Sequence, residues 1–243
     1  MSADLGLQTY VVNLKRRQDR RERITRQLPA ELTVEFTSDW DGPFDGAALD
    51  GEVLRALGVG LFPWRIESNN PWWNRTLKYG EVGCTLSHLA CWKRGLETDA
   101  PLFMIVEDDV RLVDGFLPRL LEGIEAVREN GEIGLTYLAR CPMEPDQLAW
   151  PGFVRPGFSY CTWGYLLDRE TARQLVDAQV EMAVIPVDEF LPAMYLDHPR
   201  PDVRTRFPRR IEALAFAPPL LADPSDELSD SDTETSADAW VLT

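Results

Sequence analysis

The chain has 243 residues, of which 44% are hydrophobic, so it is long enough to form one sizeable domain with a buried core. Its net charge of -15 excludes nucleic acid as the main partner, because binding to a phosphate backbone depends on an excess of Lys and Arg. No apolar run approaches the ~20 residues that span a bilayer, and the segment from Met1 to Leu7 lacks the regions of a signal peptide. We therefore expect a cytoplasmic protein without a transmembrane segment.

Charge is distributed unevenly along the chain. Seven positive side chains lie between Lys15 and Arg26, whereas the segment from Asp223 to Glu234 has six acidic side chains and no basic one. A basic segment within an acidic protein favours a small anionic ligand, although it could equally be the solvated face of a surface helix. From about Asp223 the composition is rich in Ser, Asp, Glu and Thr and cannot fold independently. We predict one domain over residues 1–222 and an acidic tail over residues 223–243, which is either disordered or ordered by a ligand or metal.

The first elements predict the opening of an α/β domain. Thr9–Leu14 is a β-branched, apolar run typical of a buried strand, and a helical pattern follows over Asp19–Leu28. Residues 37–79 are rich in Gly, Pro, Asp and Trp and are predicted to be mostly loop, with one short helix near Leu54. The four cysteines show no CxxC pairing, so we expect reduced thiols.

Stronger patterns follow in the middle of the chain. An amphipathic helix is predicted over Glu81–Glu97, entered through Gly80. The continuous apolar run Pro101–Val106 predicts a central strand covered on both faces. Further strands are predicted over Ile133–Leu138 and Thr162–Leu167, and further helices over Glu170–Gln179 and from Asp188 onward.

Three consecutive acidic residues, Glu107, Asp108 and Asp109, follow the predicted central strand directly. Like charges this close together repel, and burial disfavours their ionisation, so a divalent cation would relieve both costs. Carboxylate oxygens suit Mg2+ or Mn2+, which can also bridge the phosphates of a nucleotide. In open α/β sheets the ligand crevice lies at the carboxyl ends of the strands, where this triplet falls. On these residues alone, a solvated turn is the alternative.

A second group of candidates lies at the start of the predicted helix. Gly80 and Gly83 leave free backbone amides near the positive end of the helix dipole, where an anion can bind. Ser87 and His88 follow one turn further along. His88 is alternatively a hydrogen-bonded structural residue, and each of these patterns is weak evidence when taken separately.

Together these segments resemble glycosyltransferase family 25, which includes lipooligosaccharide and procollagen galactosyltransferases. The resemblance rests on Val12–Arg23, Gly80–His88 and Val106–Asp109, and Pro186–Pro192 and Ser229–Ser236 resemble the procollagen galactosyltransferase branch. It implies a GT-A fold, in which helices flank a mixed central sheet. It also implies a UDP-sugar donor, inverting transfer to a hydroxyl, and Mn2+ (or Mg2+) held by the acidic triplet and the donor diphosphate.

The resemblance also implies roles for individual residues. Glu107 and Asp109 are expected at the metal and Asp108 nearer the donor sugar. Asp188 is the preferred candidate for the base that deprotonates the acceptor, with Glu189 as second candidate, although Asp188 could instead only cap its helix. Contacts with the nucleotide or diphosphate are expected from Asn13, Arg17, Arg20, Gly80, Gly83, Ser87 and His88. The other arginines of the basic run are expected only at the surface.

The acceptor is less well defined. A procollagen-type enzyme would modify hydroxylysine in the secretory pathway, but this sequence shows neither a signal peptide nor an ER-retention signal. We therefore expect a hexose, galactose before glucose, to be transferred to a glycan, a glycolipid or a hydroxylysine-like peptide. The alternative is a non-catalytic homologue that binds glycans or a protein partner as a scaffold.

Overall fold

The computed structural model describes residues 6–40, 42, 44–222 and 231–241. Its main strands are β1 (Leu7–Val12), β2 (Thr33–Phe36), β3 (Leu102–Glu107), β5 (Leu135–Pro142), β6 (Gln147–Trp150), β7 (Phe153–Arg155), β8 (Ser159–Asp168) and β9 (Ala213–Phe216). Within the described residues they form one eight-stranded sheet in the order β2-β1-β3-β8-β5-β9-β7-β6. A separate short pair joins β4 (Arg111–Leu112) to β10 (Leu221–Ala222).

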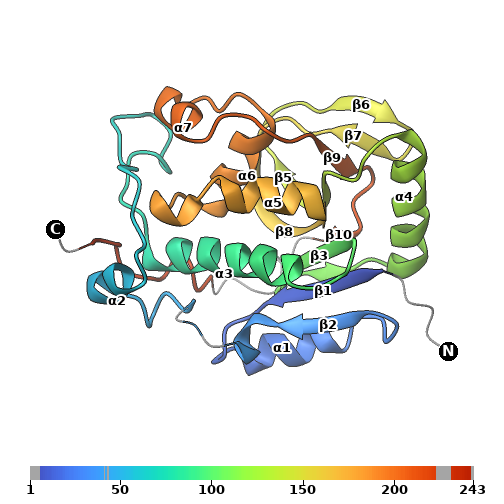
Figure 1. Cartoon of the computed structure of the whole chain (residues 1–243), viewed down its shortest axis with the longest axis horizontal. Helices are drawn as coiled ribbons and strands as arrows, with labels where there is room; N and C mark the ends of the chain where they lie inside the picture. Colours follow the sequence, from blue (N-terminus) through green and yellow to red (C-terminus); the bar gives the residue numbers. More distant parts are fainter. Residues whose placement is uncertain (1–5, 41, 43, 223–230, 242–243) are drawn as a thin grey trace.

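Helices cover both faces of this sheet (Figure 1). They are α1 (Gln18–Thr25), α2 (Gly51–Ala56), α3 (Tyr79–Leu96), α4 (Phe116–Asn130), α5 (Arg169–Asp177), α6 (Val187–Tyr195) and α7 (Pro201–Arg206), with short 3-10 turns η1 (Thr37–Asp39) and η2 (Val180–Met182). The apolar stripes of α3, α5 and α6 pack on one face, and α1 and α4 pack on the other. Every helix in the described part of the chain is too short or too polar to cross a membrane.

The central strand β3 explains why the core has two halves. Its side chains alternate, so Phe103 and Ile105 join one apolar cluster while Met104 and Val106 join the other. Strand β1 pairs with β3 in the parallel direction, and β8 pairs with β3 in the antiparallel direction. The continuous apolar run therefore reflects burial on both faces, as the sequence predicts.

The predicted α/β architecture with a mixed sheet is confirmed and is consistent with a GT-A-like fold. The predicted strands and helices are present, with ends that shift by one to four residues, and the 37–79 segment is mostly loop. Helix α4 was not predicted, although Leu120, Ile124 and Val127 have helical spacing and are buried. The short strands β2, β6, β7 and β9 were also missed, because runs of three or four residues carry little periodicity of their own.

The parallel pair β1 and β3 fixes the location of the candidate site. Val12 lies opposite Glu107 in this pair, so both strands end at the same edge of the sheet. Asn13, at the end of β1, therefore meets the acidic triplet at the end of β3.

Candidate functional site

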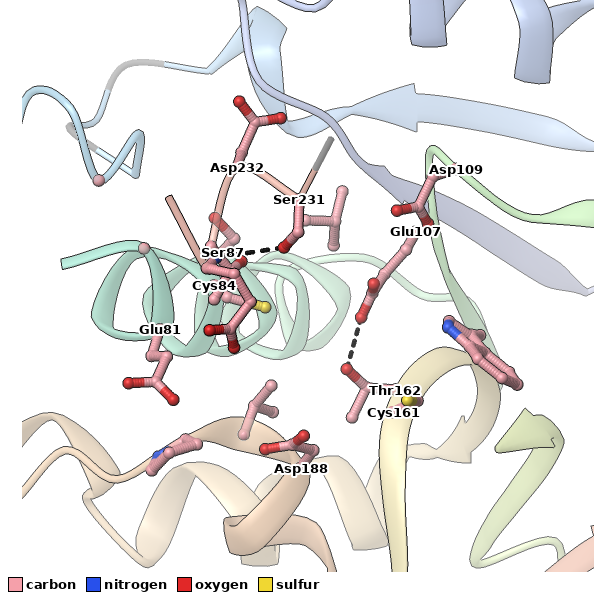
Figure 2. A pocket seen from close by; sticks show the side chains of 18 of the residues that line it. Glu81, Cys84, Ser87, Glu107, Asp109, Cys161, Thr162, Asp188, Ser231 and Asp232 are labelled. Atoms are coloured by element: carbon pink, nitrogen blue, oxygen red, sulfur yellow. Dashed lines mark hydrogen bonds between the residues drawn. The ribbon is translucent and has the colours of Figure 1, made fainter. Parts of the chain in front are cut away.

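A pocket of about 580 Å³ lies at this edge, between the carboxyl ends of β1 and β3 and the first turns of α3 and α6 (Figure 2). Most of the residues predicted for the site line it: Asn13, Arg20, Gly80, Ser87, Glu107, Asp108, Asp109, Asp188 and Glu189. Arg17, Gly83 and His88, which were also predicted for the site, do not line the pocket. The structure thus brings together side chains that are up to 176 positions apart in the sequence, Asn13 and Glu189.

The acidic triplet is held by two residues of the first strand and helix. Asp108 is buried and accepts hydrogen bonds from Nδ2 of Asn13 at 2.6 Å and from Arg20 at 3.2 Å. The same guanidinium nitrogen of Arg20 is 3.2 Å from Oδ2 of Asp109. The other oxygen of Asp109 is buried and has no hydrogen-bond partner among the described residues. A buried carboxylate oxygen without a donor is costly unless a cation approaches it.

The electrostatics of the triplet fit a divalent cation. Burial, followed by repulsion from Glu107 and Asp108, raises the pKa of Asp109 to about 7. Burial also raises the pKa of Asp108 above its ordinary value. Burial acts on Glu107 in the same direction, but the nearby imidazole of His88 and the hydroxyl of Thr162 outweigh it and lower the pKa of Glu107. Hard oxygen ligands with unfavourable mutual repulsion are a suitable donor set for Mn2+ or Mg2+.

Arg20 is the cation that the structure itself supplies to the triplet. Replacing it in Arg20→Gln should lower the free energy of unfolding by about 3 kcal/mol at pH 7.5, because Asp108 and Asp109 lose a buried partner. The loss should shrink at pH 5.5, where Asp109, with a pKa of about 7, takes up a proton and needs less compensation. Urea unfolding of the wild type and of Arg20→Gln at pH 7.5 and pH 5.5 measures the difference in the free energy of unfolding.

Arg26→Gln is the matched control for that experiment, because Arg26 belongs to the same basic run but is exposed. It should change the free energy of unfolding by less than about 0.5 kcal/mol. Equal losses for Arg20→Gln and Arg26→Gln would contradict the account of the triplet.

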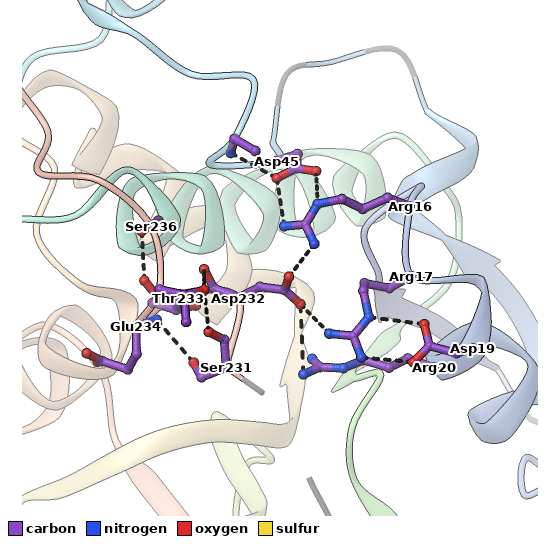
Figure 3. Close-up of polar contacts among 12 residues, drawn as sticks. Arg16, Arg17, Asp19, Arg20, Asp45, Ser231, Asp232, Thr233, Glu234 and Ser236 are labelled. Carbon is purple, nitrogen blue, oxygen red and sulfur yellow. Dashed lines mark hydrogen bonds and ion pairs between the residues drawn. The ribbon is translucent and has the colours of Figure 1, made fainter. Parts of the chain in front are cut away.

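Residues 231–234 line the pocket, and the segment that they begin contacts both predicted anion sites. Figure 3 shows Asp232 facing Arg16, Arg17 and Arg20. The carboxylate of Asp232 accepts hydrogen bonds from Arg16 and, at 2.7 Å, from Arg17, and it lies 3.8 Å from Arg20. Arg16, predicted to be only a surface residue, thus also lines the pocket. Residues 223–230, including Ser229 and Asp230 of the tail motif, lie outside the described residues.

The start of α3 is covered by the same segment. The backbone amide of Gly80, predicted to receive an anion, donates to Oγ of Ser236 at 2.8 Å. A Cβ on Gly80 would come within 2.6 Å of the backbone of Thr233, and one on Gly83 within 2.2 Å of the carbonyl oxygen of Phe44. Both glycines are therefore required by close packing, whether or not they also meet a ligand.

Asp232 should hold residues 231–241 in place. In Asp232→Asn the two arginine contacts weaken, and we expect faster hydrogen exchange of the amides of residues 231–241 and a loss of about 1–2 kcal/mol in the free energy of unfolding. Asp238→Asn makes the same chemical change at an exposed position of the same segment and should leave exchange unchanged. The role of Asp232 would be refuted if both variants exchanged like the wild type.

The two candidate bases on α6 have different surroundings. Glu189 is 2% exposed, and its two oxygens accept hydrogen bonds of 2.8 Å from Trp73 and His198. The Glu189 carboxylate is therefore held by hydrogen bonds in the lining of the pocket. Asp188 lies across the pocket from Glu107 and Asp109 (Figure 2).

Asp188 has the properties of a base that is poised near neutral pH. Burial, followed by repulsion from Glu189 and Glu81, raises the pKa of Asp188 to about 8, while the backbone of Cys161 donates a hydrogen bond to it. Cys161 has a φ of 63°, in the left-handed region that non-glycine residues rarely adopt. Helix α6 shows no side-chain cap, so Asp188 does not cap its own helix.

Some residues of the pocket could not be recognised from the sequence. Thr162 donates to Oε1 of Glu107 at 2.5 Å from β8, and Arg75 forms a double hydrogen bond with Glu81 at 2.7 and 2.9 Å. Trp72, which is 42% exposed, and Trp163 line the pocket as well, and their aromatic faces could stack on a base or a sugar. Their roles follow from long-range contacts, which leave no local pattern in the sequence.

Comparison with known proteins places these features in a family. Residues 7–153 match the model of glycosyltransferase family 25 (LPS biosynthesis protein). Over 242 residues the chain is 37% identical to a human protein named inactive glycosyltransferase 25 family member 3, and 38% identical to a Bos taurus protein named probable inactive glycosyltransferase 25 family member 3; each match covers 95% of this chain. It is also 35% identical over 241 residues, 93% of this chain, to human procollagen galactosyltransferase 2.

The matched region is only part of those proteins. The chain spans 39% of the length of the human and bovine family members 3 and 37% of human procollagen galactosyltransferase 2. In sequence identity, relatives named as galactosyltransferases and relatives named as inactive are similar to this chain to nearly the same degree.

Proposed function

The chain belongs to glycosyltransferase family 25, and from this premise we propose that it transfers a hexose from a UDP-sugar to an acceptor hydroxyl with inversion, with the help of a divalent metal. The observation that carries the proposal is the acidic triplet, in which Asp108 is buried and Asp109 has a raised pKa of about 7. One buried oxygen of Asp109 has no donor among the described residues. A glycan- or protein-binding surface would have no need for such a costly cluster.

Glu107 and Asp109 would hold Mn2+ or Mg2+ together with the donor diphosphate. When bound, the metal neutralises the charge that develops on the leaving diphosphate. Asp108, which is held by Asn13 and Arg20, would orient the donor sugar. Arg16 would meet the diphosphate, since guanidinium groups match phosphate oxygens in a bidentate manner. Arg17, which does not line the pocket, would act through Asp232, whose carboxylate contacts both arginines.

Asp188 would act as the base. Inverting transfer forms a bond between the acceptor oxygen and the anomeric carbon on the face opposite the bond to UDP, which breaks at the same time. The acceptor hydroxyl loses its proton to the Asp188 carboxylate, and UDP leaves with the electron pair. The position of Asp188 across the pocket from the triplet supports this division of roles.

The proposal extends to the identity of the transferred sugar and of the acceptor. Relatives named procollagen galactosyltransferase favour galactose, and the acceptor would be a glycan, a glycolipid or a hydroxylysine-like peptide. A cytoplasmic location stays a prediction.

A donor screen tests this function. The purified chain, incubated with Mn2+ and a series of UDP-hexoses without acceptor, should slowly release UDP from one donor, with UDP-galactose expected first. Addition of EDTA should stop the release. Release that is unaffected by EDTA, or absent for every UDP-sugar with the metal present, would contradict the proposal.

A non-catalytic scaffold is the second candidate, because relatives named inactive are 36–38% identical to this chain. A scaffold would keep the fold and bind a glycan or a protein without turning over a donor. Calorimetry with UDP and Mn2+ separates the two, since a scaffold that has lost the donor site gives no metal-dependent heat of binding.

A further inference from the structure

We propose that His88 is a positioning residue, which orients the carboxylate of Glu107 for the metal and does not contact the donor itself. The inference rests on the proposed function, because it assigns His88 a role through a proposed metal ligand. It replaces the expectation that His88 binds the nucleotide or diphosphate.

His88 is completely buried on the inner side of α3 and does not line the pocket. Its Nε2 is 3.5 Å from Oε1 of Glu107, and its Nδ1 is 2.7 Å from the hydroxyl oxygen of Tyr165. The indole N–H of Trp92, one turn further along α3, donates to the same hydroxyl oxygen at 2.9 Å. The imidazole is thus held between a buried polar network and one side chain of the pocket.

The direction of this network follows from its first donor. An indole N–H can only donate, so the Tyr165 oxygen accepts from Trp92. The hydroxyl's other hydrogen-bond partner among the described residues is Nδ1 of His88, so the Tyr165 hydrogen finds an acceptor only when it points to Nδ1. Nδ1 is then an acceptor, which places the imidazole hydrogen on Nε2, facing Glu107. Among the described residues Nε2 has no other hydrogen-bond partner and lies 3.5 Å from Oε1 of Glu107, so the series ends facing the proposed metal ligand.

Glu107 is held from two elements at once. His88 approaches Oε1 from α3, and Thr162 donates to the same oxygen from β8. Partners of this kind fix the orientation of a metal ligand, and their removal typically costs about 10- to 100-fold in metal affinity. Without them, a glutamate at the end of a strand would sample several rotamers and lose affinity for the cation.

Cys84 offers a different explanation. A sulfur of Cys84, a ring nitrogen of His88 and an oxygen of Glu107 lie within 4.8 Å of one another, so the three could bind a cation directly. Direct binding would use the lone pair of Nε2 and move the imidazole hydrogen to Nδ1, which would deprive the Tyr165 hydroxyl of its acceptor. A thiolate also suits softer metals than the oxygen-preferring Mn2+ or Mg2+. The network therefore favours positioning over direct ligation.

Binding of Mn2+ in the presence of UDP, followed through the electron paramagnetic resonance signal of the free ion, tests this proposal without reference to turnover. His88→Leu and Thr162→Val should each weaken Mn2+ binding about 10- to 100-fold. His88→Gln should remain within about threefold of the wild type, because an amide N–H then lies near the position of Nε2. Cys84→Ser should also bind Mn2+ like the wild type.

The possible outcomes are distinct. If His88→Leu is folded and binds Mn2+ as tightly as the wild type, the positioning role is wrong while the proposed function stands. If His88→Gln and Cys84→Ser lose binding as strongly as His88→Leu, direct ligation replaces positioning. If the wild type itself binds no Mn2+ with UDP, the proposed function is wrong, and this inference is wrong with it. Thermal unfolding checks each fold. If His88→Leu does not fold, His88→Gln carries the test, because loss of Mn2+ binding in a folded His88→Gln would contradict positioning through an N–H.

Discussion

Asp109→Asn should reduce Mn2+-dependent transfer at least about 1,000-fold, which corresponds to about 4 kcal/mol of lost transition-state stabilisation. Asparagine keeps the shape of the side chain but removes the charge that we propose for metal binding. The same change should stabilise the metal-free protein at pH 7.5, because the buried carboxylate repels Glu107 and Asp108. Transfer assays and urea unfolding of the same preparation measure both effects.

Asp114→Asn is the matched control for this variant. Asp114 is exposed and lies only five positions further along the chain, so its replacement makes the same chemical change outside the pocket. It should leave both activity and stability unchanged. Full Mn2+-dependent turnover in Asp109→Asn would remove Asp109 from the proposed metal site.

Asp188→Asn should lower kcat about 100- to 10,000-fold, the usual range for loss of a general base, while the affinity for Mn2+ and UDP is kept. In the wild type, kcat should rise with pH up to about 8, because only the ionised carboxylate accepts a proton. A variant with asparagine at this position should lose that dependence. Single-turnover rates over a pH series measure it.

The same substitution has a predictable effect on stability. The pKa of Asp188 is about 8 in the folded chain against an ordinary value of 3.8, so folding takes up a proton between these pH values. The contribution of Asp188 to the stability of the wild type therefore falls as the pH rises from about 4 to about 8. Asp188→Asn removes this loss, and its melting temperature should exceed that of the wild type by an amount that grows over this window.

Replacement of the neighbouring carboxylate, Glu189, should change the melting temperature in the opposite direction. Glu189→Gln should lower the melting temperature, because an amide cannot accept hydrogen bonds through both of its heavy atoms from Trp73 and His198. If Asp188→Asn destabilised the protein and Glu189→Gln did not, the assignment of the two carboxylates would have to be reversed.

The acidic triplet illustrates what the sequence could predict. The run Pro101–Val106 predicts a strand buried on both faces, and the carboxyl end of such a strand is a preferred ligand site in α/β proteins. The sequence therefore predicts a ligand site at Glu107, Asp108 and Asp109. The resemblance to the family then indicated that Asn13 and Asp188 belong to the same site. All of them line one pocket.

Contacts between distant segments could not be predicted in this way. The network from Trp92 to Glu107 joins one helix to two strands, and neither its order nor its direction is visible in a linear pattern. The contacts of Asp232 with Arg16 and Arg17 cross 216 and 215 positions. Composition alone indicated that the acidic segment cannot fold independently, but it carries no information on the surface that orders residues 231–241.

The most direct test of the metal-dependent donor site is a calorimetric titration of the wild-type chain with UDP, in Mn2+ and again in EDTA. The account predicts saturable binding in Mn2+ and an affinity at least about tenfold lower in EDTA, because the buried carboxylates then repel the diphosphate. Equal affinity for UDP with and without the metal would contradict it.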